Sequence, residues 1–521
     1  MLTLLHDGAA HTVATDGEGA FRFAPPSPGR YELVSIAAAG YLPFAADPGQ
    51  SPVALEARPG VRLDGVTLYL EPAVERDGLV LDARDAPLAG AEVRLLDGDD
   101  RFASDAQGRF RFHAPDGATL EARKPGFAIA WAAVERTGRT TLRLVPLPDG
   151  GASETIALAG RVVDPAGRPV EGALVTAGPP RAPFAVEPPP ARAFTDGEGR
   201  FAFADLAPAR EFSVEARAPA FAPARAEHAA PGARDLVLTL RAGGVLRGAV
   251  RDSSTGKPLA AFAVVLWPVI GPLERGPRID AARLDAGGRY AVDGLAPGRF
   301  RATAIARGFA PADEIEIAIP PSLEPVEQDF ALGRGAEVRG RVVEKEGGAP
   351  IAGARVSLEG SVTPDAPLPA LDDALTDGNG EFRLSGLAPG LRSLLVTAER
   401  HHGRILGLRV TEGAPPLTVE LARVADGEEP HVELVGIGAV LAGKGDALVI
   451  GRVLPSGGAA QAGLVAGDAI LTVDGAPVVA LGFGQAIQRI RGPEGSTVEL
   501  GLRRADGANQ VLAVSRMPIQ H

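Results

Sequence analysis

The sequence predicts a mainly β protein, made of five tandem antiparallel β-sandwiches followed by one small α+β domain. A short phrase, an acidic Gly-rich turn running into alternating aromatic residues, occurs five times. Its first acidic residue falls 89, 91, 89 and 92 residues after the previous one, at Asp16, Asp105, Asp196, Asp285 and Asp377. A period that long matches one whole small domain rather than a solenoid repeat. After Arg423 the phrase disappears, which indicates a domain of another kind.

This spacing sets the expected boundaries, which are 1–72, 73–149, 154–242, 243–333 and 334–424 for the five sandwiches and 431–521 for the last domain. We number the sandwiches domains 1 to 5 and call the last one the C-terminal domain. Domain 1 is expected to be incomplete, because its opening strand is missing. We therefore expect further sequence upstream of Met1, including an export signal, since residues 1–5 have no basic segment before their apolar residues.

The amino-acid composition and the net charge exclude several classes of function. Of the 521 residues, 66 are Gly and 46 are Pro, and 5% are aromatic, which favours short strands joined by turns. The net charge of −12 includes no basic block, so nucleic acid is not an expected partner. The lack of cysteine excludes disulfides, thiolate zinc sites and a cysteine nucleophile. The longest apolar run, 259–273, contains Pro and Gly and is too short to span a membrane, so we expect an inner strand there.

Domain 3 shows the expected order of elements. A β-branched strand begins at Gly160, and a polar turn, Pro169 and a Gly-Ala pair lead into the second strand. Proline lacks a backbone N–H and suits an edge position. The domain ends with an apolar strand over 236–240. Short strands without helical periodicity predict an antiparallel sandwich.

The repeated phrase predicts a hairpin corner. The Asp side chain is expected to accept a hydrogen bond from the backbone two residues ahead. The following strand alternates, as in Phe201 and Phe203, which places both rings in the core. We interpret the phrase as structural, with weak calcium binding as the alternative, because the further carboxylates of a calcium loop are missing. Its last glycine is present in every copy, which indicates positive φ, at Gly19, Gly108, Gly199, Gly288 and Gly380.

Two other features leave alternatives open. Three Pro-rich loops, 178–192, 267–283 and 360–374, either line up as a binding edge or only separate neighbouring domains. Trp267 beside the second loop allows a glycan site, although exposed aromatic residues are few and the other tryptophan is Trp131. The histidines form no zinc motif, and His401-His402 is expected to be an exposed strand or loop feature. No metal site, cofactor or catalytic residue is predicted.

The phrases Gly-x-Val-x-Asp, Gly-x-Pro-[Val/Leu]-x-Gly-Ala, Thr-Asp-Gly-x-Gly-x-Phe and Leu-x-Pro-Gly together resemble the carboxypeptidase regulatory-like domain. The resemblance covers about 1–424 and implies a transthyretin-like fold. It says little about function, because a fold alone does not define one.

The C-terminal domain resembles a PDZ domain of the type found in bacterial C-terminal-processing proteases. The resemblance rests on Ala-Gly-Leu-x-x-Gly-Asp-x-Ile-Leu-x-Val-Asp-Gly over 462–475, and it covers about 433–518. It implies that a partner's extended C-terminus adds to the strand after the 436–439 loop. A helix over 483–491 would close the groove. The implied peptide-binding residues are Gly436, Ile437, Gly438, Ala439, Val440, Phe483, Ala486, Ile487 and Ile490.

These modules lead us to expect a non-enzymatic scaffold or adaptor of the bacterial cell envelope, periplasmic or on the cell surface. Its sandwiches would act as spacers that present the PDZ domain to protein or peptide C-termini. One alternative is an accessory subunit, or a fragment, of an envelope protease, which would then be a partner. Another is a surface adhesin or glycan-binding protein.

Overall fold

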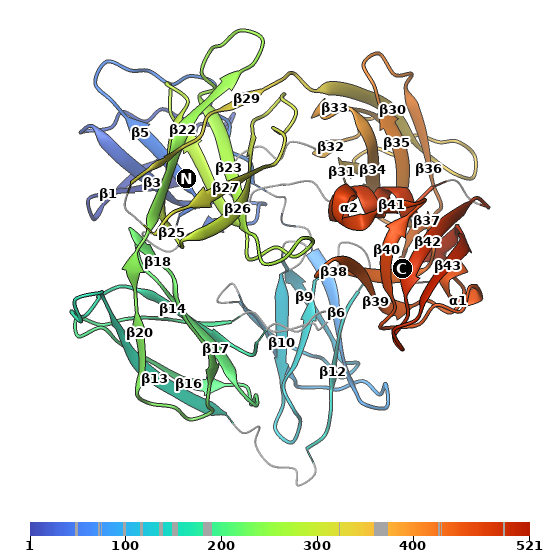
Figure 1. Cartoon of the computed structure of the whole chain (residues 1–521), viewed down its shortest axis with the longest axis horizontal. Coiled ribbons are helices and arrows are strands. Elements are labelled where there is room, and N and C mark those ends of the chain that lie inside the picture. Colours follow the sequence, from blue (N-terminus) through green and yellow to red (C-terminus); the bar gives the residue numbers. More distant parts are fainter. Residues whose placement is uncertain are drawn as a thin grey trace.

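The computed structural model describes residues 1–46, 51–70, 73, 75–96, 100–114, 118–134, 139–147, 155–180, 190–321, 324–358, 373–425, 428, 430–492 and 495–520 (Figure 1). The chain is mainly β, as the sequence predicts. Within this described part, no helix combines the length and the apolar character needed to cross a membrane.

Domain 3 is a sandwich of a three-stranded and a four-stranded sheet. The first sheet places the opening strand between the strand after the corner and the closing strand, in the order β16 (Arg200–Leu206), β13 (Ile156–Val163), β20 (Leu236–Thr239). The second has the order β15 (Ala191–Phe194), β14 (Leu174–Gly178), β17 (Phe212–Arg217), β19 (Ala224–Ala229). The short strands β18 (Phe221–Ala222) and β21 (Arg241–Ala242) pair beside them.

Domains 2, 4 and 5 repeat this arrangement. In domain 2 the sheets are β12 (Thr140–Leu144), β6 (Glu75–Asp82), β9 (Arg109–His113) and β11 (Ala130–Ala133), β10 (Thr119–Arg123), β7 (Glu92–Leu95), β8 (Arg101–Ala103). In domain 4 the first sheet contains β25 (Arg289–Leu295), β22 (Gly244–Asp252), β28 (Val326–Glu327) and β29 (Phe330–Leu332), and the second β24 (Ile279–Leu284), β23 (Ala261–Pro268), β26 (Gly298–Ile305) and β27 (Ile315–Ile319). In domain 5 they are β33 (Glu381–Leu387), β30 (Ala336–Glu344), β36 (Leu417–Leu421) and β32 (Asp373–Leu375), β31 (Arg355–Leu358), β34 (Gly390–Thr397), β35 (Gly403–Val410).

One pair of strands in each of these sandwiches departs from a purely antiparallel pattern. The opening strand runs parallel to the closing strand, as in β13 and β20, while its other neighbour is antiparallel. The core between the sheets contains the aromatic residues that follow the corner. In domain 3 these are Phe201 and Phe203, which pack with Leu158, Val162 and Val214.

The corner has the predicted geometry in all five domains. Each corner Asp accepts hydrogen bonds through Oδ1 from the backbone N–H groups two and four residues ahead, at 2.6 to 3.4 Å. The last glycine has φ between 67° and 80°. The aspartates are thus used by the turn itself, which supports the structural interpretation over calcium binding.

Domain 1 differs from the others. It contains β1 (Leu2–His6), β2 (Ala9–Val13), β3 (Gly29–Ile36), β4 (Phe44–Ala45) and β5 (Val53–Ala57). The prediction that Phe21–Phe23 forms a strand is wrong, because these residues lie outside the strands. In the other domains this segment pairs with the opening strand, which has no counterpart in the described part of domain 1.

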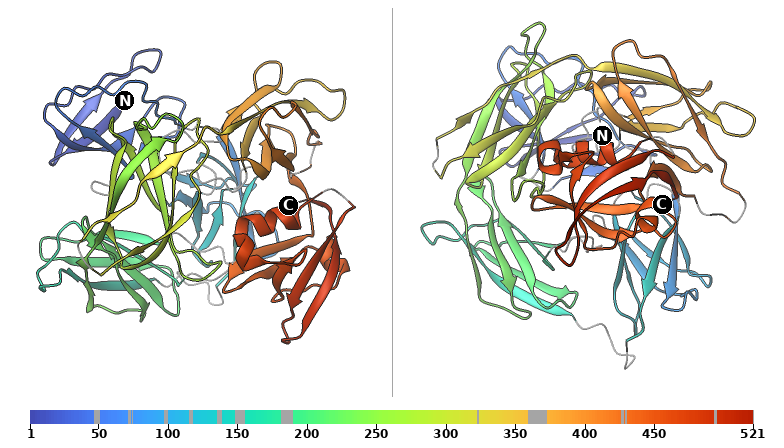
Figure 2. Two further views of the ribbon diagram at one scale, coloured as in Figure 1. Left: turned by 45° about the horizontal axis from the view of Figure 1, so that its top comes forward. Right: turned by 45° about the vertical axis from the view of Figure 1, so that its right-hand side comes forward.

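Domain 1 is joined edge to edge to domain 4 (Figures 1 and 2). Strand β5 pairs in parallel with β24, which produces one nine-stranded sheet from the two domains. The Arg58 guanidinium also forms an ion pair with the buried carboxylate of Asp285. As a result β23 is buried on both faces, with Val264 in the core of domain 4 and Val265 in the core shared with domain 1. This explains its continuous apolar sequence.

The C-terminal domain has a six-stranded sheet in the order β38 (Ala439–Lys444), β39 (Ala447–Val453), β40 (Ala469–Val473), β42 (Thr497–Arg503), β43 (Asn509–Ser515), with the sixth strand, β41 (Ala476–Pro477), beside β40. The helices are α1 (Gly458–Gln461) and α2 (Val478–Ile490). Strands β37 (Val432–Gly436) and β44 (Met517–Gln520) pair with each other and continue the sheet of domain 5 through β35. The C-terminal domain is therefore fastened to domain 5 by backbone hydrogen bonds.

Candidate functional site

The loop between β37 and β38 has the geometry of a receptor for an anion. The carbonyls of Ile437 and Gly438 accept hydrogen bonds from Ala459 (2.6 Å) and Leu454 (2.8 Å) of the domain itself. The N–H groups of Ile437 and Gly438 have no backbone acceptor among the described residues. Gly438 has φ of 76°, and a Cβ there would lie 2.6 Å from Cα of Gly457. The loop thus needs glycine, and two of its N–H groups lack a backbone acceptor in the described structure, a pattern that suits a carboxylate.

Strand β38 follows this loop and lies at the edge of its sheet. Its one neighbour in the described part of the chain is β39. The outer edge of an unpaired strand presents N–H and C=O groups that an extended chain can pair with. Ala439 and Val440, both half-buried, are the first two residues of this edge.

Helix α2 packs against β39, β40 and β41 of the same domain. It spans Val478–Ile490 and consists of two helical segments, of which the second begins after Gly482, at the predicted start Phe483. Gly482 has φ of 72° and ψ of 163° and kinks the helix between the two segments. Glycine tolerates this conformation, which allows the first turn to change direction.

The predicted helix residues have two different environments. Ala486 and Ile490 are buried in the core of the domain. Ile487 is half-buried, and Phe483 is 39% exposed. Since core residues are inaccessible to a ligand, Phe483 and Ile487 remain the candidates for peptide contact. Gly436 and Ile437 are likewise buried, so only the backbone of these two residues remains a candidate for ligand contact.

The C-terminal end of α2 is held by the buried Arg516. Its guanidinium donates to the carbonyls of Ile490 (3.0 Å) and Arg489 (2.8 Å) and to the hydroxyl of Ser496 (3.0 Å). A cation at a helix C-terminus satisfies carbonyls that lack helical partners. Arg516 therefore fixes the C-terminal end of α2, a role that no motif in the sequence predicts.

A hairpin from domain 4 also contributes to this domain. Residues 268–276, the connection between β23 and β24, form the tip of the second Pro-rich loop. Leu273 from this tip is buried in the core of the C-terminal domain. The other two Pro-rich loops lie largely outside the described residues. The place of the loop within domain 4 was predictable from the sequence, but its contact with the C-terminal domain, between residues 171 positions apart, was not.

The histidine pair lies at the joint between domain 5 and the C-terminal domain. His401 and His402 are buried, so their expected exposure is wrong. The His402 and His431 rings lie 3.8 Å apart between centroids, and His402 Nε2 is 3.5 Å from the Glu428 carboxylate. One ligand-type atom from each of these three residues lies within 4.8 Å of the others. Nδ1 of His402 accepts a hydrogen bond from the backbone N–H of His431 (3.3 Å), which leaves its Nε2 facing Glu428. Nε2 of His431 is buried and has no hydrogen-bond partner in the described structure, so hydrogen bonding does not account for every ligand-type atom of this cluster.

Neither tryptophan offers a flat exposed face for a sugar. Trp267 is 9% exposed, and the guanidinium of Arg275 lies 4.8 Å from its ring centroid. Trp131 is half-buried and donates its Nε1–H to Glu121 at 3.1 Å. Trp131 is thus engaged within domain 2 and Trp267 in the core that domain 4 shares with domain 1, which weakens the glycan alternative.

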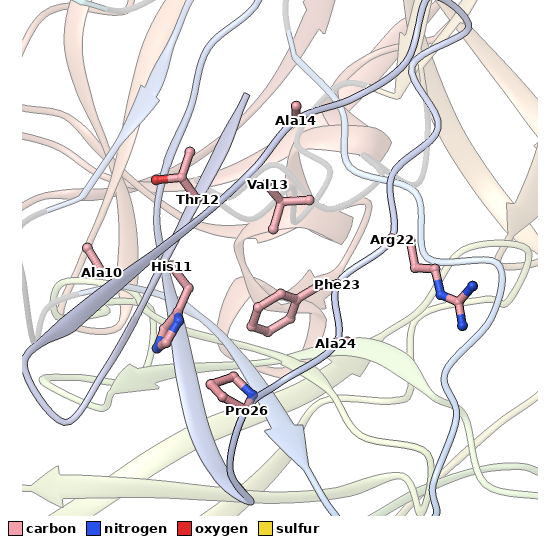
Figure 3. A pocket seen from close by; sticks show the side chains of 9 residues that line it. All are labelled: Ala10, His11, Thr12, Val13, Ala14, Arg22, Phe23, Ala24 and Pro26. Carbon is pink, nitrogen blue, oxygen red and sulfur yellow. The ribbon is translucent and has the colours of Figure 1, made fainter.

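A separate shallow pocket lies in domain 1, with a volume of about 630 Å³. Figure 3 shows Val13 and Phe23 facing one another across it, while Arg22 points away. No carboxylate lines it, and His11 is its one side chain suited to proton transfer. Its position follows from the missing pairing of the 21–23 segment. The lining residues are Ala10, His11, Thr12, Val13, Ala14, Arg22, Phe23, Ala24 and Pro26.

Comparisons with known proteins agree with this architecture. The carboxypeptidase regulatory-like domain family matches residues 157–241 and 337–422, and the PDZ domain family matches residues 428–503. The chain thus contains tandem carboxypeptidase regulatory-like domains followed by a C-terminal PDZ domain. Both are non-catalytic binding modules. Among curated proteins, none matches the chain.

Three solved structures show similarity. The PDZ domain of the carboxy-terminal protease from Vibrio cholerae, in complex with peptide, is 33% identical over 17% of this chain and 99% of its own, with a TM-score of 0.16. The Bacillus anthracis TIE protein is 12% identical over 69% of this chain and 72% of its own, with a TM-score of 0.17. A streptococcal ancillary pilin is 10% identical over 67% of this chain and 99% of its own, with a TM-score of 0.18.

Proposed function

We propose that this protein is a non-enzymatic adaptor of the bacterial cell envelope whose PDZ domain binds the free C-terminus of an extended partner chain. The terminal carboxylate would bind at the N–H groups of Ile437 and Gly438. The preceding residues would pair with the edge of β38, and their side chains would contact Phe483 and Ile487 of α2.

The observation that carries this proposal is the combination of a free anion-binding loop with an unpaired strand edge that follows it directly. The loop N–H groups lack backbone acceptors in the described structure, and β38 has one open side. Main-chain pairing supplies affinity in this mode of recognition, and pockets for alternate side chains supply specificity. The five sandwiches act as the frame that holds the module. An exported location, periplasmic or on the cell surface, is part of the same proposal.

A selection with a random C-terminal peptide library on the full chain tests the proposal. The best peptides, resynthesised, should bind as free acids and lose about tenfold or more in affinity as C-terminal amides, because an amide has no charge for the loop to bind. Equal binding of acid and amide would remove the carboxylate site.

Two variants serve as a matched pair for this experiment. Gly438→Val places a Cβ against Gly457 at a positive φ and should abolish peptide binding. Gly445→Ala also has a positive φ, but a Cβ there meets nothing within 4 Å, so it should retain binding. Binding that survives Gly438→Val would show that the peptide uses another surface.

A further inference from the structure

The hairpin 268–276 of domain 4 contacts the PDZ domain at the end of β38 that lies farthest from the 436–439 loop. The backbone N–H of Leu273 donates to the carbonyl of Gly445 at 3.3 Å. In return, the N–H of Gly445 donates to the carboxylate of Glu274 at 2.6 Å. Domain 4 therefore uses both main-chain hydrogen-bonding groups of the residue at which β38 turns into β39.

Leu273 also covers the inner face of β38. Side chains alternate along a strand, so Gly443 shares a face with Ala439 and Leu441, which pack against the domain core. A Cβ at Gly443 would lie 2.5 Å from the carbonyl oxygen of Leu273. Glycine at this position therefore permits the backbone of domain 4 to approach, and the Leu273 side chain, 8% exposed, fills the space below it.

The hairpin is fixed in place by its own domain. Arg275 forms two hydrogen bonds with Glu314, at 3.0 and 2.9 Å, and stacks over Trp267. The N–H of Gly276 donates to the carbonyl of Pro268 at 2.8 Å. Bidentate Arg–carboxylate pairs fix geometry as well as charge, so the tip forms a fixed wall.

We infer that this hairpin closes the far end of the peptide groove and restricts the ligand to a short C-terminal tail. The inference rests on the proposed function of the PDZ domain. A peptide bound at the loop can pair with β38 from Ala439 to Gly443, five residues or about 16 Å of extended chain. There it meets Leu273 and Glu274, so the residues further upstream must leave the groove.

The length dependence of peptide binding tests this inference. The best peptide from the library selection is made in a five-residue and a ten-residue form with the same free C-terminus, and both are titrated against the full chain. The native protein should bind the two within about twofold of each other. Leu273→Asp should release the tip, because an unpaired carboxylate is not buried, and the ten-residue form should then bind about fivefold or more tightly than the five-residue form.

Three further variants control for unrelated damage. Ile270→Asp changes an exposed residue of the same hairpin (66% exposed) and should behave as the native protein. Glu274→Gln keeps an oxygen acceptor for the Gly445 N–H and should also behave as native. Glu274→Ala removes this acceptor, and its ratio of the two peptide affinities should lie between those of the native protein and Leu273→Asp. Leu273→Ala provides a milder change should the aspartate variant fail to fold.

Hydrogen exchange without peptide gives a second readout. The backbone N–H groups of segment 441–447 should exchange faster in Leu273→Asp than in the native protein. In Ile270→Asp their exchange rates should equal those of the native protein. Unaltered exchange in Leu273→Asp, or a native protein that binds the longer peptide more than fivefold better, would overturn the inference. If the ratio of the affinities for the two peptide lengths is the same in all variants, the inference would also be overturned, while the proposed function would remain intact. No binding at any length in any variant would instead remove the proposed function, and this inference with it.

Discussion

Glu121 and Glu215 are buried carboxylates at corresponding positions of domains 2 and 3. Glu121 lies directly opposite Arg94 and Trp131 on the neighbouring strands and accepts from Arg94 Nε at 2.8 Å. Burial by itself raises the pKa of Glu121, but hydrogen bonds from Arg123 and Arg94 outweigh it and hold the pKa below the usual range. Paired and hydrogen-bonded in this way, the charge stabilises the native domain.

Glu121→Gln should destabilise domain 2 by about 2–3 kcal/mol, because it leaves Arg94 and Arg123 without their countercharge. The protein has two tryptophans, so in a Trp267→Phe background the fluorescence of Trp131 reports on domain 2 alone. Urea unfolding followed at this tryptophan measures the change. As control, Glu75→Gln alters an exposed ion pair of the same domain and should cost less than about 1 kcal/mol.

The same carboxylate gives domain 2 a pH dependence with a defined sign. The folded pKa of Glu121 lies below the unfolded value of about 4.3. Its stabilisation is therefore present above that pH and is lost as the pH falls through the folded pKa. The Trp131 unfolding midpoint should fall between about pH 5 and pH 3, and less steeply in Glu121→Gln. A parallel fall in both proteins would show that other groups control the effect.

At the level of elements, the corner of each sandwich was predictable from the sequence, because the hydrogen bonds to its Asp side chain lie within five consecutive residues. The 436–439 loop was predictable from its resemblance to a known motif, although its hydrogen bonds come from Leu454 and Ala459, further along the chain. The short helical segment from Val478 was missed because the non-helical Gly482 separates it from the predicted helix, which begins at Phe483. The Phe21–Phe23 segment was also missed, since a strand depends on a partner that is distant in sequence.

Gly199→Ala should destabilise domain 3 by more than the cost of positive φ, which is about 1–2 kcal/mol. A Cβ at this position would lie 2.5 Å from the carbonyl oxygen of Val162, so the corner must move. Gly197→Ala in the same turn should be near neutral, because a Cβ there meets nothing within 4 Å, and domain 2 itself has Ala106 at this position. Hydrogen exchange in segment 156–163 measures both, and equal effects would contradict this account.

For the whole molecule, the number and kind of domains were predictable, but their arrangement was not. The domains lie around a closed path, with domain 4 touching domain 1 and the C-terminal domain (Figures 1 and 2). These contacts depend on a few backbone pairings, such as Ala282 with Val53, and on single side chains such as Leu273. No periodic pattern marks such residues in a sequence.

Arg58→Glu should loosen the joint between domains 1 and 4, because it places a second negative charge beside the buried Asp285. Small-angle scattering should show a radius of gyration larger by roughly 5–10% as domain 1 moves away. Arg62→Glu is the matched control, since Arg62 is highly exposed and pairs with Asp64 of its own segment. An unchanged radius in Arg58→Glu would show that the β5–β24 pairing alone maintains the joint.

The edge pairing of β5 with β24 has a mechanical consequence. Tension applied between the N-terminal domain and the C-terminal domain would pass from domain 1 into domain 4 and on through the 268–276 hairpin, bypassing domains 2 and 3. Domains 2 and 3 and their linkers would carry no load until the β5–β24 pairing or the contact of the 268–276 hairpin ruptures. Under tension the protein would first resist extension. It would lengthen only after these contacts between domains have ruptured in one step.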